Sequence, residues 1–288
     1  MVELSPAGDG VAMGFAGDTF NTAYYARRSL GPDWQVDYLT ALGCDPLSDR
    51  ILDFIARCNI GTTHITRIPT RAPGLYMIHL TGAERSFTYW RDHSAARLLA
   101  HDPAHLQTAL HKAELIYLSG ITLAILSADD RANLRDALAL ARRKGAAIAF
   151  DSNLRPRLWP DLATMRASVI DMLALTDVAL PSFDDEATAF GDATPDATAH
   201  RIHAAGVPLV IVKNGPNPVT VLSPEGLQHF AVRPAPGIVD TTAAGDSFNA
   251  GFLAAYLTGH DLRTATATAA SLAAQVIAVS GALVDRPA

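Results

Sequence analysis

The sequence of 288 residues has few cysteines and no long apolar run, and both shortages limit what the protein can be. Cys44 and Cys58 are too few for a disulfide framework and lack the spacing of metal ligands. No apolar run reaches the ~18 residues of a membrane-spanning helix. Glu3 and Asp9 interrupt the opening, where a signal peptide would need an apolar stretch. We therefore expect a cytoplasmic protein with reduced thiols and no membrane partner.

Positive charge is also scarce. The chain has 23 Lys and Arg against 29 Asp and Glu, a net charge of −6, and no block of basic residues. This composition argues against a nucleic-acid partner. A few local cations can still dominate one cleft, so an anionic small substrate is compatible with the charge balance. Hydrophobic residues make up 49% of the chain, enough for the core of one domain over residues 1–288.

Short β-branched apolar runs alternate with longer amphipathic ones along most of the chain. This alternation predicts an α/β fold with a mainly parallel sheet between two layers of helices. The expected strands are 36–40, 115–119, 147–151, 178–181, 209–213 and 219–222. The expected helices are 21–30, 47–58, 129–143, 162–175, 197–205, 247–258 and 262–279.

One stretch interrupts this alternation. Residues 74–80 and 86–91 flank the turn-like Thr81-Gly82-Ala83-Glu84, which predicts a β-hairpin outside the main sheet, in the position of a lid. A period of two places Phe87, Tyr89 and Arg91 on one face of the second strand. That face is either a ligand platform or a surface arginine beside a small apolar cluster.

The strongest local signal for chemistry is the segment 240–251. Small residues precede Asp246, and an amphipathic helix pattern follows it. Backbone N–H groups at a helix start bind anions, and small side chains let the backbone approach them closely. Taken alone, Asp246 could equally be an acid that interacts with the helix dipole.

The whole string Asp240-Thr241-Thr242-Ala243-Ala244-Gly245-Asp246 resembles the second signature of the PfkB, or ribokinase-like, carbohydrate kinases. The first signature of that family is matched by residues 16–23. Further runs, Tyr89-Trp90-Arg91 and Asn153-Leu154-Arg155-Pro156-Arg157-Leu158-Trp159, resemble the subgroup that phosphorylates 2-keto-3-deoxygluconate. The resemblance covers nearly the whole chain and implies a ribokinase-like three-layer α/β/α sandwich with a small β-sheet lid, contributed mainly by residues 6–16 and 71–95.

The resemblance also implies roles for individual residues. Asp246 would be the catalytic base, with the backbone of Ala243, Ala244 and Gly245 around the transferring phosphoryl group. The sugar acid would be bound by Gly17, Asp18, Asn21, Tyr76, Tyr89, Arg91 and Arg155 together with Asp246. For Asn21, capping of its helix is the alternative.

ATP and Mg²⁺ are the cofactors that the resemblance implies. ATP would be bound by Lys213, Gly215, Ala244, Gly245, Ala273 and Gly281. The family's Asn-x-x-Glu motif, which organises Mg²⁺ through water, corresponds to Ser182 followed by Asp185 or Glu186, and either acid fits a hydrated ion.

The chain departs from the family pattern at two places. The family has a longer first strand before a segment like residues 1–5, so we expect part of a central strand to be absent or to lie upstream. Pro216 and Pro218 remove N–H donors from the loop after Lys213, which favours modest ATP affinity.

Three other functions compete with a sugar-acid kinase: a kinase of the same family for a neutral sugar such as fructose or ribose, a non-catalytic sugar-acid-binding homologue, and a dinucleotide-dependent dehydrogenase. Arg91 and Arg155 argue against the first, the intact Asp246 string against the second, and the lack of a Gly-x-Gly-x-x-Gly helix start against the third. The family also leads us to expect a homo-oligomer that pairs through the lid.

Overall fold

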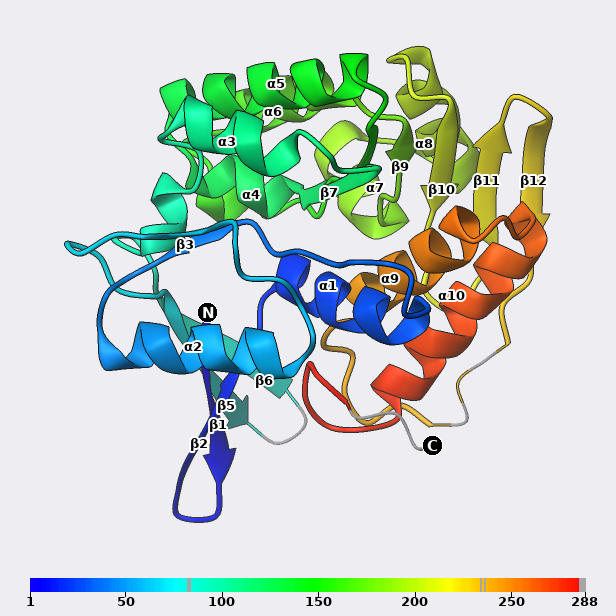
Figure 1. Ribbon diagram of the computed structural model, residues 1–288. Coiled ribbons are helices and arrows are strands. Elements are labelled where there is room, and N and C mark those ends of the chain that lie inside the picture. The colour runs from blue at the N-terminus through cyan, green and yellow to red at the C-terminus, as the bar shows by residue number, and fades with distance from the viewer. Residues whose placement is uncertain (82–83, 234, 236, 285–288) are drawn as a thin grey trace.

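The computed structural model describes residues 1–81, 84–233, 235 and 237–284, and it has the expected α/β architecture (Figure 1). Its main sheet has the strand order β12-β11-β10-β9-β8-β7. The four strands from β7 to β10 are parallel, and β11 and β12 continue the sheet in antiparallel pairing. The strands are β7 (Leu115–Ser119), β8 (Ala147–Asp151), β9 (Val178–Ala179), β10 (Leu209–Val212), β11 (Val219–Ser223) and β12 (Gly226–Phe230).

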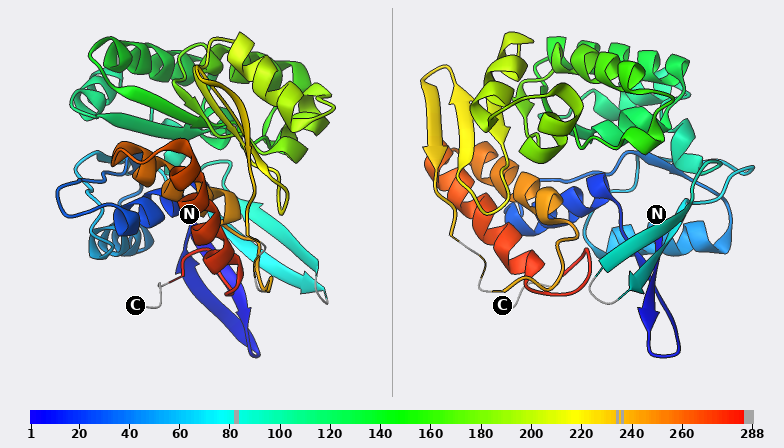
Figure 2. Two further views of the ribbon diagram at one scale, coloured as in Figure 1. Left: turned by 90° about the vertical axis from the view of Figure 1, so that its right-hand side faces the viewer. Right: turned by 180° about the vertical axis from the view of Figure 1, so that it is seen from behind.

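Helices cover both faces of this sheet (Figure 2). In β8, Ile148 and Phe150 belong to the apolar cluster shared with helices α5, α6 and α8, whereas Ala149 belongs to the cluster shared with α9 and α10. Alternate side chains of a strand point to opposite faces, so one buried strand serves both layers. The helices are α1 (Asp18–Ser29), α2 (Pro46–Arg57), α3 (Pro103–Leu110), α4 (Gly120–Ile125), α5 (Ala128–Arg143), α6 (Leu162–Leu173), α7 (Phe183–Phe190), α8 (Pro195–Ala204), α9 (Ala244–Leu257) and α10 (Leu262–Ile277).

A second sheet, which we call the small sheet, projects from the main body (Figure 1). It has the order β2-β1-β5-β6, with β1 (Val2–Ala7), β2 (Gly10–Phe15), β5 (Leu75–Thr81) and β6 (Glu84–Trp90). The predicted hairpin is confirmed as β5 and β6. Gly82 and Ala83 of the predicted turn lie outside the described residues. As expected from the period of two, Phe87 stacks on Tyr89 and Arg91 lies over the Tyr89 ring.

The predicted strand at 36–40 was wrong. The strand begins only at its last residue, and β3 (Thr40–Leu42) pairs with β4 (Ile65–Arg67) in a separate two-stranded sheet. Asp37 forms a single bridge with Gly61, whose N–H also donates to the carbonyl of Val36. The apolar side chains of Val36, Tyr38 and Leu39 instead line a cavity of about 680 Å³ between this segment, α1 and β7. The apolar run therefore predicted packing against the core, but Val36, Tyr38 and Leu39 are only partly buried and the segment does not pair as a strand.

Among the described residues, no helix is long and apolar enough to cross a membrane.

Candidate active site

Polar residues gather where the carboxyl ends of the parallel strands meet the first turns of α1 and α9. Ser119 and Asp151 are the last residues of β7 and β8, and Lys213 directly follows β10. Ligands of open α/β sheets bind beyond this edge. Residues from distant parts of the sequence are thus brought together at the edge where a site is expected.

Asp246 lies in the first turn of α9. Asn21, from α1, donates from Nδ2 to Asp246 Oδ2 at 2.8 Å. The pKa of Asp246 is raised to about 7, mainly because the carboxyl group is removed from solvent, and the negative charge of Asp18 raises it further. The hydrogen bond from Asn21 opposes the shift. The group therefore gains and loses a proton near neutral pH, as a general base requires.

The turn that leads into α9 is held in an unusual conformation. Ala243, directly before the helix, has φ 60° and ψ 15°, a left-handed geometry that is rare for a residue with a Cβ. Asp240 holds the turn in place: it accepts from the N–H of Thr242 at 3.0 Å and from that of Gly281 at 2.7 Å. Strained backbone of this kind is typical of functional sites. The predicted Gly281 thus joins the C-terminal segment to the α9 turn.

The start of α9 also offers backbone donors. The Ala244 N–H turns back to the carbonyl of Thr241 at 3.2 Å. Gly245 and Asp246 contribute the next N–H groups of the first turn. At this position of a helix an N–H group has no carbonyl partner within the helix, so both can donate to an anion. Of the three predicted backbone donors, the structure therefore favours Gly245.

Asp18 is the second carboxylate of the site. Ser119 Oγ and Asn153 Nδ2 both donate to its Oδ2, the latter at 3.3 Å. Burial raises the pKa of Asp18, while its interaction with Arg155 acts in the opposite direction. Asn153 takes the uncommon φ of 33°, and its N–H donates to Asp151 Oδ1 at 3.0 Å. Asp18 is thus held by residues at or just after the carboxyl ends of two neighbouring strands, β7 and β8.

Two arginines bring positive charge to this group. The Arg91 guanidinium lies 4.1 Å from the centre of the Tyr89 ring. Burial lowers the pKa of Arg91; the charge of Asp18 raises this pKa, and the charge of Arg155 lowers it further. Arg155 is half exposed and donates from Nη1 to Asp185 Oδ2 at 3.1 Å. Both predicted cations therefore lie within electrostatic reach of Asp18, at the solvent side of the site.

The tyrosines of the small sheet form one cluster. The Tyr76 and Tyr89 rings are 6.0 Å apart, and each is about as far from Phe87. The Tyr76 hydroxyl donates to Glu3 on β1. Burial raises the pKa of Tyr76, with a smaller contribution from the charge of Asp246. The small sheet thus reaches the same site as α9.

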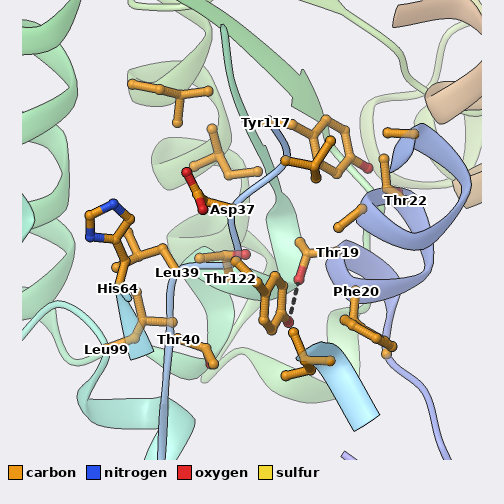
Figure 3. A pocket seen from close by; sticks show the side chains of 18 of the residues that line it. Thr19, Phe20, Thr22, Asp37, Leu39, Thr40, His64, Leu99, Tyr117 and Thr122 are labelled. Atoms are coloured by element: carbon orange, nitrogen blue, oxygen red, sulfur yellow. Dashed lines mark hydrogen bonds between the residues drawn. The ribbon is translucent and has the colours of Figure 1, made fainter. Parts of the chain in front are cut away.

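A cavity lies beside α1 and borders the site at Asp18 and Arg91, whereas Asp246, Tyr76, Tyr89 and Arg155 are not among the residues that line it. Gly17, Asp18 and Arg91 line it, and its inner part is mainly apolar. In Figure 3, Thr19 and Thr22 of α1 point into the cavity toward Tyr117 of β7 and the segment that carries Leu39 and Thr40. The Thr19 and Tyr38 hydroxyls, on two residues that line the cavity, are 3.1 Å apart and form a hydrogen bond. The cavity is thus lined mainly by α1, the segment 33–42 and β7, and it adjoins the site at Asp18.

The remaining predicted nucleotide residues lie on both sides of the α9 turn. Gly215 is exposed and has φ 53°, which suits glycine. Ala273 is partly buried on α10, where it packs against the α9 cluster. Lys213 is buried, and its Nζ donates to Asp151 Oδ2 at 2.7 Å and to Asn249 Oδ1 at 3.0 Å. In this state the ammonium is therefore engaged within the protein.

The two candidate metal residues differ in their surroundings. Glu186 is fully buried, accepts from Ser152 Oγ, and pairs with Arg201 Nη2 at 2.7 Å. Asp185 keeps 30% of its side chain exposed and pairs with Arg155. Burial raises the pKa of both acids. Among the described residues no group of three or more His, Cys, Asp or Glu could hold a metal ion, so direct coordination by the protein alone does not fit, whereas a hydrated Mg²⁺ held through water does.

Five polar residues of this region were not predicted as site residues from the sequence: Ser119, Tyr117, Asp151, Asn153 and Asn249. A usable signal was present for two of them, because Ser119 and Asp151 are polar residues at the end of otherwise apolar strands that were predicted with the correct bounds. In a parallel sheet such residues face the site.

Comparison with known proteins identifies the family and the fold. A family model described as pfkB family carbohydrate kinase matches residues 2–288. The 2-dehydro-3-deoxygluconokinases of Haemophilus influenzae and Escherichia coli (strain K12) are each 40% identical to the chain; the matches cover 95% and 100% of this chain and 89% and 96% of those relatives. The crystal structure of 2-dehydro-3-deoxygluconokinase from Thermotoga maritima, 21% identical, has the same fold, with a TM-score of 0.86 over 99% of this chain and 93% of that one. The chain therefore belongs to the pfkB family of carbohydrate kinases.

Proposed function

We propose that this protein transfers the γ-phosphoryl group of ATP to the 6-hydroxyl of 2-keto-3-deoxygluconate, which is the 2-dehydro-3-deoxygluconate of its relatives' names. The observation that carries the proposal is the joint position of Asp246 and two arginines: a carboxylate that titrates near pH 7 lies at one end of the site, and Arg91 and Arg155 lie at the other. The 40% identity to 2-dehydro-3-deoxygluconokinases supports the same substrate.

Asp246 acts as the base for the acceptor hydroxyl. Asn21 holds its Oδ2, which leaves Oδ1 to accept the hydroxyl proton as the new O–P bond forms. The Gly245 N–H, at the start of α9, faces the phosphoryl group and stabilises its charge. Because the carboxylate is already held by Asn21 and by the fixed Ala243 turn, little reorganisation is needed during transfer.

The sugar acid is recognised by opposite charges at its two ends. Arg91 and Arg155 pair with the carboxylate, which a planar guanidinium grips through two parallel hydrogen bonds. Asp18 accepts from sugar hydroxyls, and Tyr76 and Tyr89 form an apolar wall with hydroxyl groups. A neutral sugar would offer neither guanidinium a carboxylate, so it would bind more weakly.

ATP binds on the α9 and α10 side, along Gly215, Ala273 and Gly281. Mg²⁺, when bound to the nucleotide phosphates, neutralises part of their charge. Asp185 is the acid that we assign to its water shell, because its side chain keeps 30% exposure, whereas Glu186 is fully buried against Arg201 and Ser152. The small sheet serves as a lid over the sugar.

The same sheet supplies a surface for pairing with a second copy. Trp90 of β6 is 55% exposed, and the alternation of side chains along the strand places it on the face opposite Phe87 and Tyr89. An exposed tryptophan of this kind is typical of protein interfaces. We include a lid-to-lid homo-oligomer and a cytoplasmic location in the proposal.

Product analysis tests the reaction. The purified protein, ATP, Mg²⁺ and 2-keto-3-deoxygluconate should give ADP and one sugar phosphate, whose phosphorus NMR signal couples to the protons at carbon 6. A phosphate on another oxygen would refute the assigned acceptor, and no consumption of the sugar acid would refute the proposed function.

A further inference from the structure

Four polar side chains meet beneath the first turn of α9, and the reaction as described above does not use them. They are Tyr117 of β7, Asp151 at the end of β8, Lys213 after β10, and Asn249 of α9; we call them the buried tetrad. Their side chains form one hydrogen-bonded group that joins three strands of the sheet to the helix.

Asn249 is the centre of the tetrad. It is 0% exposed. Its Nδ2 donates to Asp151 Oδ2 at 2.7 Å and to the Tyr117 hydroxyl at 3.0 Å, and its Oδ1 accepts from Lys213 Nζ at 3.0 Å. An amide is the side chain of this size that offers two donors and an acceptor together. Neither an apolar residue nor an acid could make this set of bonds.

The tetrad is close to the proposed chemistry. Asn249 follows Asp246 by three residues, about one helical turn. On the other side, a Cβ at Gly245 would lie 3.5 Å from Lys213 Nζ. The first turn of α9 therefore rests on the ammonium group and is tied to β8 through Asn249. Movement of the tetrad would move Asp246 and the Gly245 N–H together.

We propose that Asn249, Asp151 and Lys213 are positioning residues for phosphoryl transfer, which fix the first turn of α9 against the ends of β8 and β10. The inference rests on the proposed function, with Asp246 as base. It assigns to Lys213 a role within the protein, as the partner of Asp151 and Asn249, in place of direct binding to the phosphates of ATP. A displacement of catalytic groups by 1 Å can lower the rate about 10²-fold. Loss of a positioning residue should therefore lower kcat.

Steady-state kinetics of Asn249→Ala and Asn249→Asp test the proposal. Asn249→Asp keeps the shape and loses the two donated bonds, so it remains informative if Asn249→Ala does not fold. We expect kcat to fall about 10- to 100-fold while KM for ATP and for the sugar acid change less than about threefold. Asn133→Ala is the matched control, since Asn133 lies on α5 and donates to the carbonyl of Ala100, away from the site; it should leave kcat unchanged.

A pH profile gives a readout that a purely structural role would not move. The titratable groups that act on the pKa of Asp246 are Asp18, Asp151 and Lys213, and the charge of Asp246 in turn raises the pKa of Tyr76 and Tyr117. Asp151 raises and Lys213 lowers the pKa of Asp246. Lys213→Met should therefore shift the acidic limb of kcat/KM to higher pH, and Asp151→Asn should shift it to lower pH, each by about one unit.

The outcomes separate this inference from the proposed function. Wild-type protein that phosphorylates the sugar acid, together with an inactive Asp246→Asn variant, upholds the function. With the function upheld, folded Asn249 variants that keep kcat within twofold would overturn the positioning role. An increase in KM for ATP at unchanged kcat in Lys213→Met would also overturn it. The same holds if the acidic limbs of kcat/KM shift in the same direction in Lys213→Met and Asp151→Asn.

Discussion

The two ends of the site are built differently. At the α9 end, Asn249 is fully buried and Lys213 and Asp151 are nearly so, and each makes hydrogen bonds within the protein. At the small-sheet end, Tyr89 and Arg155 are about half exposed, and the Arg91 guanidinium rests on a ring that is itself on the surface. One end is part of the core, and the other is attached to it.

This difference matches the demands on each end. A base and an anion-binding turn act through accurate placement, which a buried and fully hydrogen-bonded network supplies. A group that admits and releases a charged substrate has to be reached by solvent. Changes at the α9 end should therefore lower kcat, whereas changes at the small-sheet end should raise KM or alter assembly.

The largest effect is expected at Asp246. Asp246→Asn removes the base while keeping the shape and the bond with Asn21, so kcat should fall roughly a thousandfold. ATP binding, measured by calorimetry, should persist. Asp129→Asn is the control, because Asp129 is an exposed acid in the first turn of α5. Near-normal turnover by Asp246→Asn would mean that Asp246 is not the base and only interacts with the dipole of α9.

The arginines should give the next largest effect, and it should appear in KM. Arg91→Gln and Arg155→Gln each remove one charged partner of the substrate carboxylate, which should raise KM for 2-keto-3-deoxygluconate about 10- to 100-fold. Arg157→Gln, at an exposed position near Arg155, is the control. If both variants lowered kcat at constant KM, the two ends would not differ as described.

The pH dependence should show the raised pKa of Asp246. Below its pKa the carboxyl group is protonated and cannot accept the hydroxyl proton, so kcat/KM should rise as the pH increases through about 7. Asn21→Ala removes a hydrogen bond that lowers this pKa, and should move the limb to higher pH. A limb near the ordinary aspartate value, or one that Asn21→Ala moves to lower pH, would contradict the electrostatic account of the site.

The smallest catalytic effect is expected on the outer face of the small sheet. Trp90 is 55% exposed on β6, and Trp90→Ser should change kcat less than about twofold. If two small sheets pair, the same substitution should lower the particle mass in light scattering. An unchanged mass would remove Trp90 from the interface, and a large loss of kcat would show that this face takes part in turnover.

Much of this arrangement could be predicted from the sequence because it depends on local patterns. The strands that end in Ser119 and Asp151 are continuous apolar runs, and their bounds were predicted residue for residue. Asp246, Asp18 and Arg91 were found through motifs. The buried tetrad was not predicted, because Tyr117, Lys213 and Asn249 meet only through tertiary packing. The predicted strand at 36–40 was wrong for the same reason. Its apolar pattern is present in the sequence, but the segment lies beside a cavity and not beside a strand of the main sheet.

The most direct test of the central claim is a coupled assay of ADP release with a panel of acceptors: 2-keto-3-deoxygluconate, its galacto epimer, fructose and ribose. If Arg91 and Arg155 select a carboxylate, kcat/KM should be at least about 100-fold higher for the sugar acids than for the neutral sugars. Turnover of fructose or ribose that equals or exceeds that of the sugar acids would contradict the account.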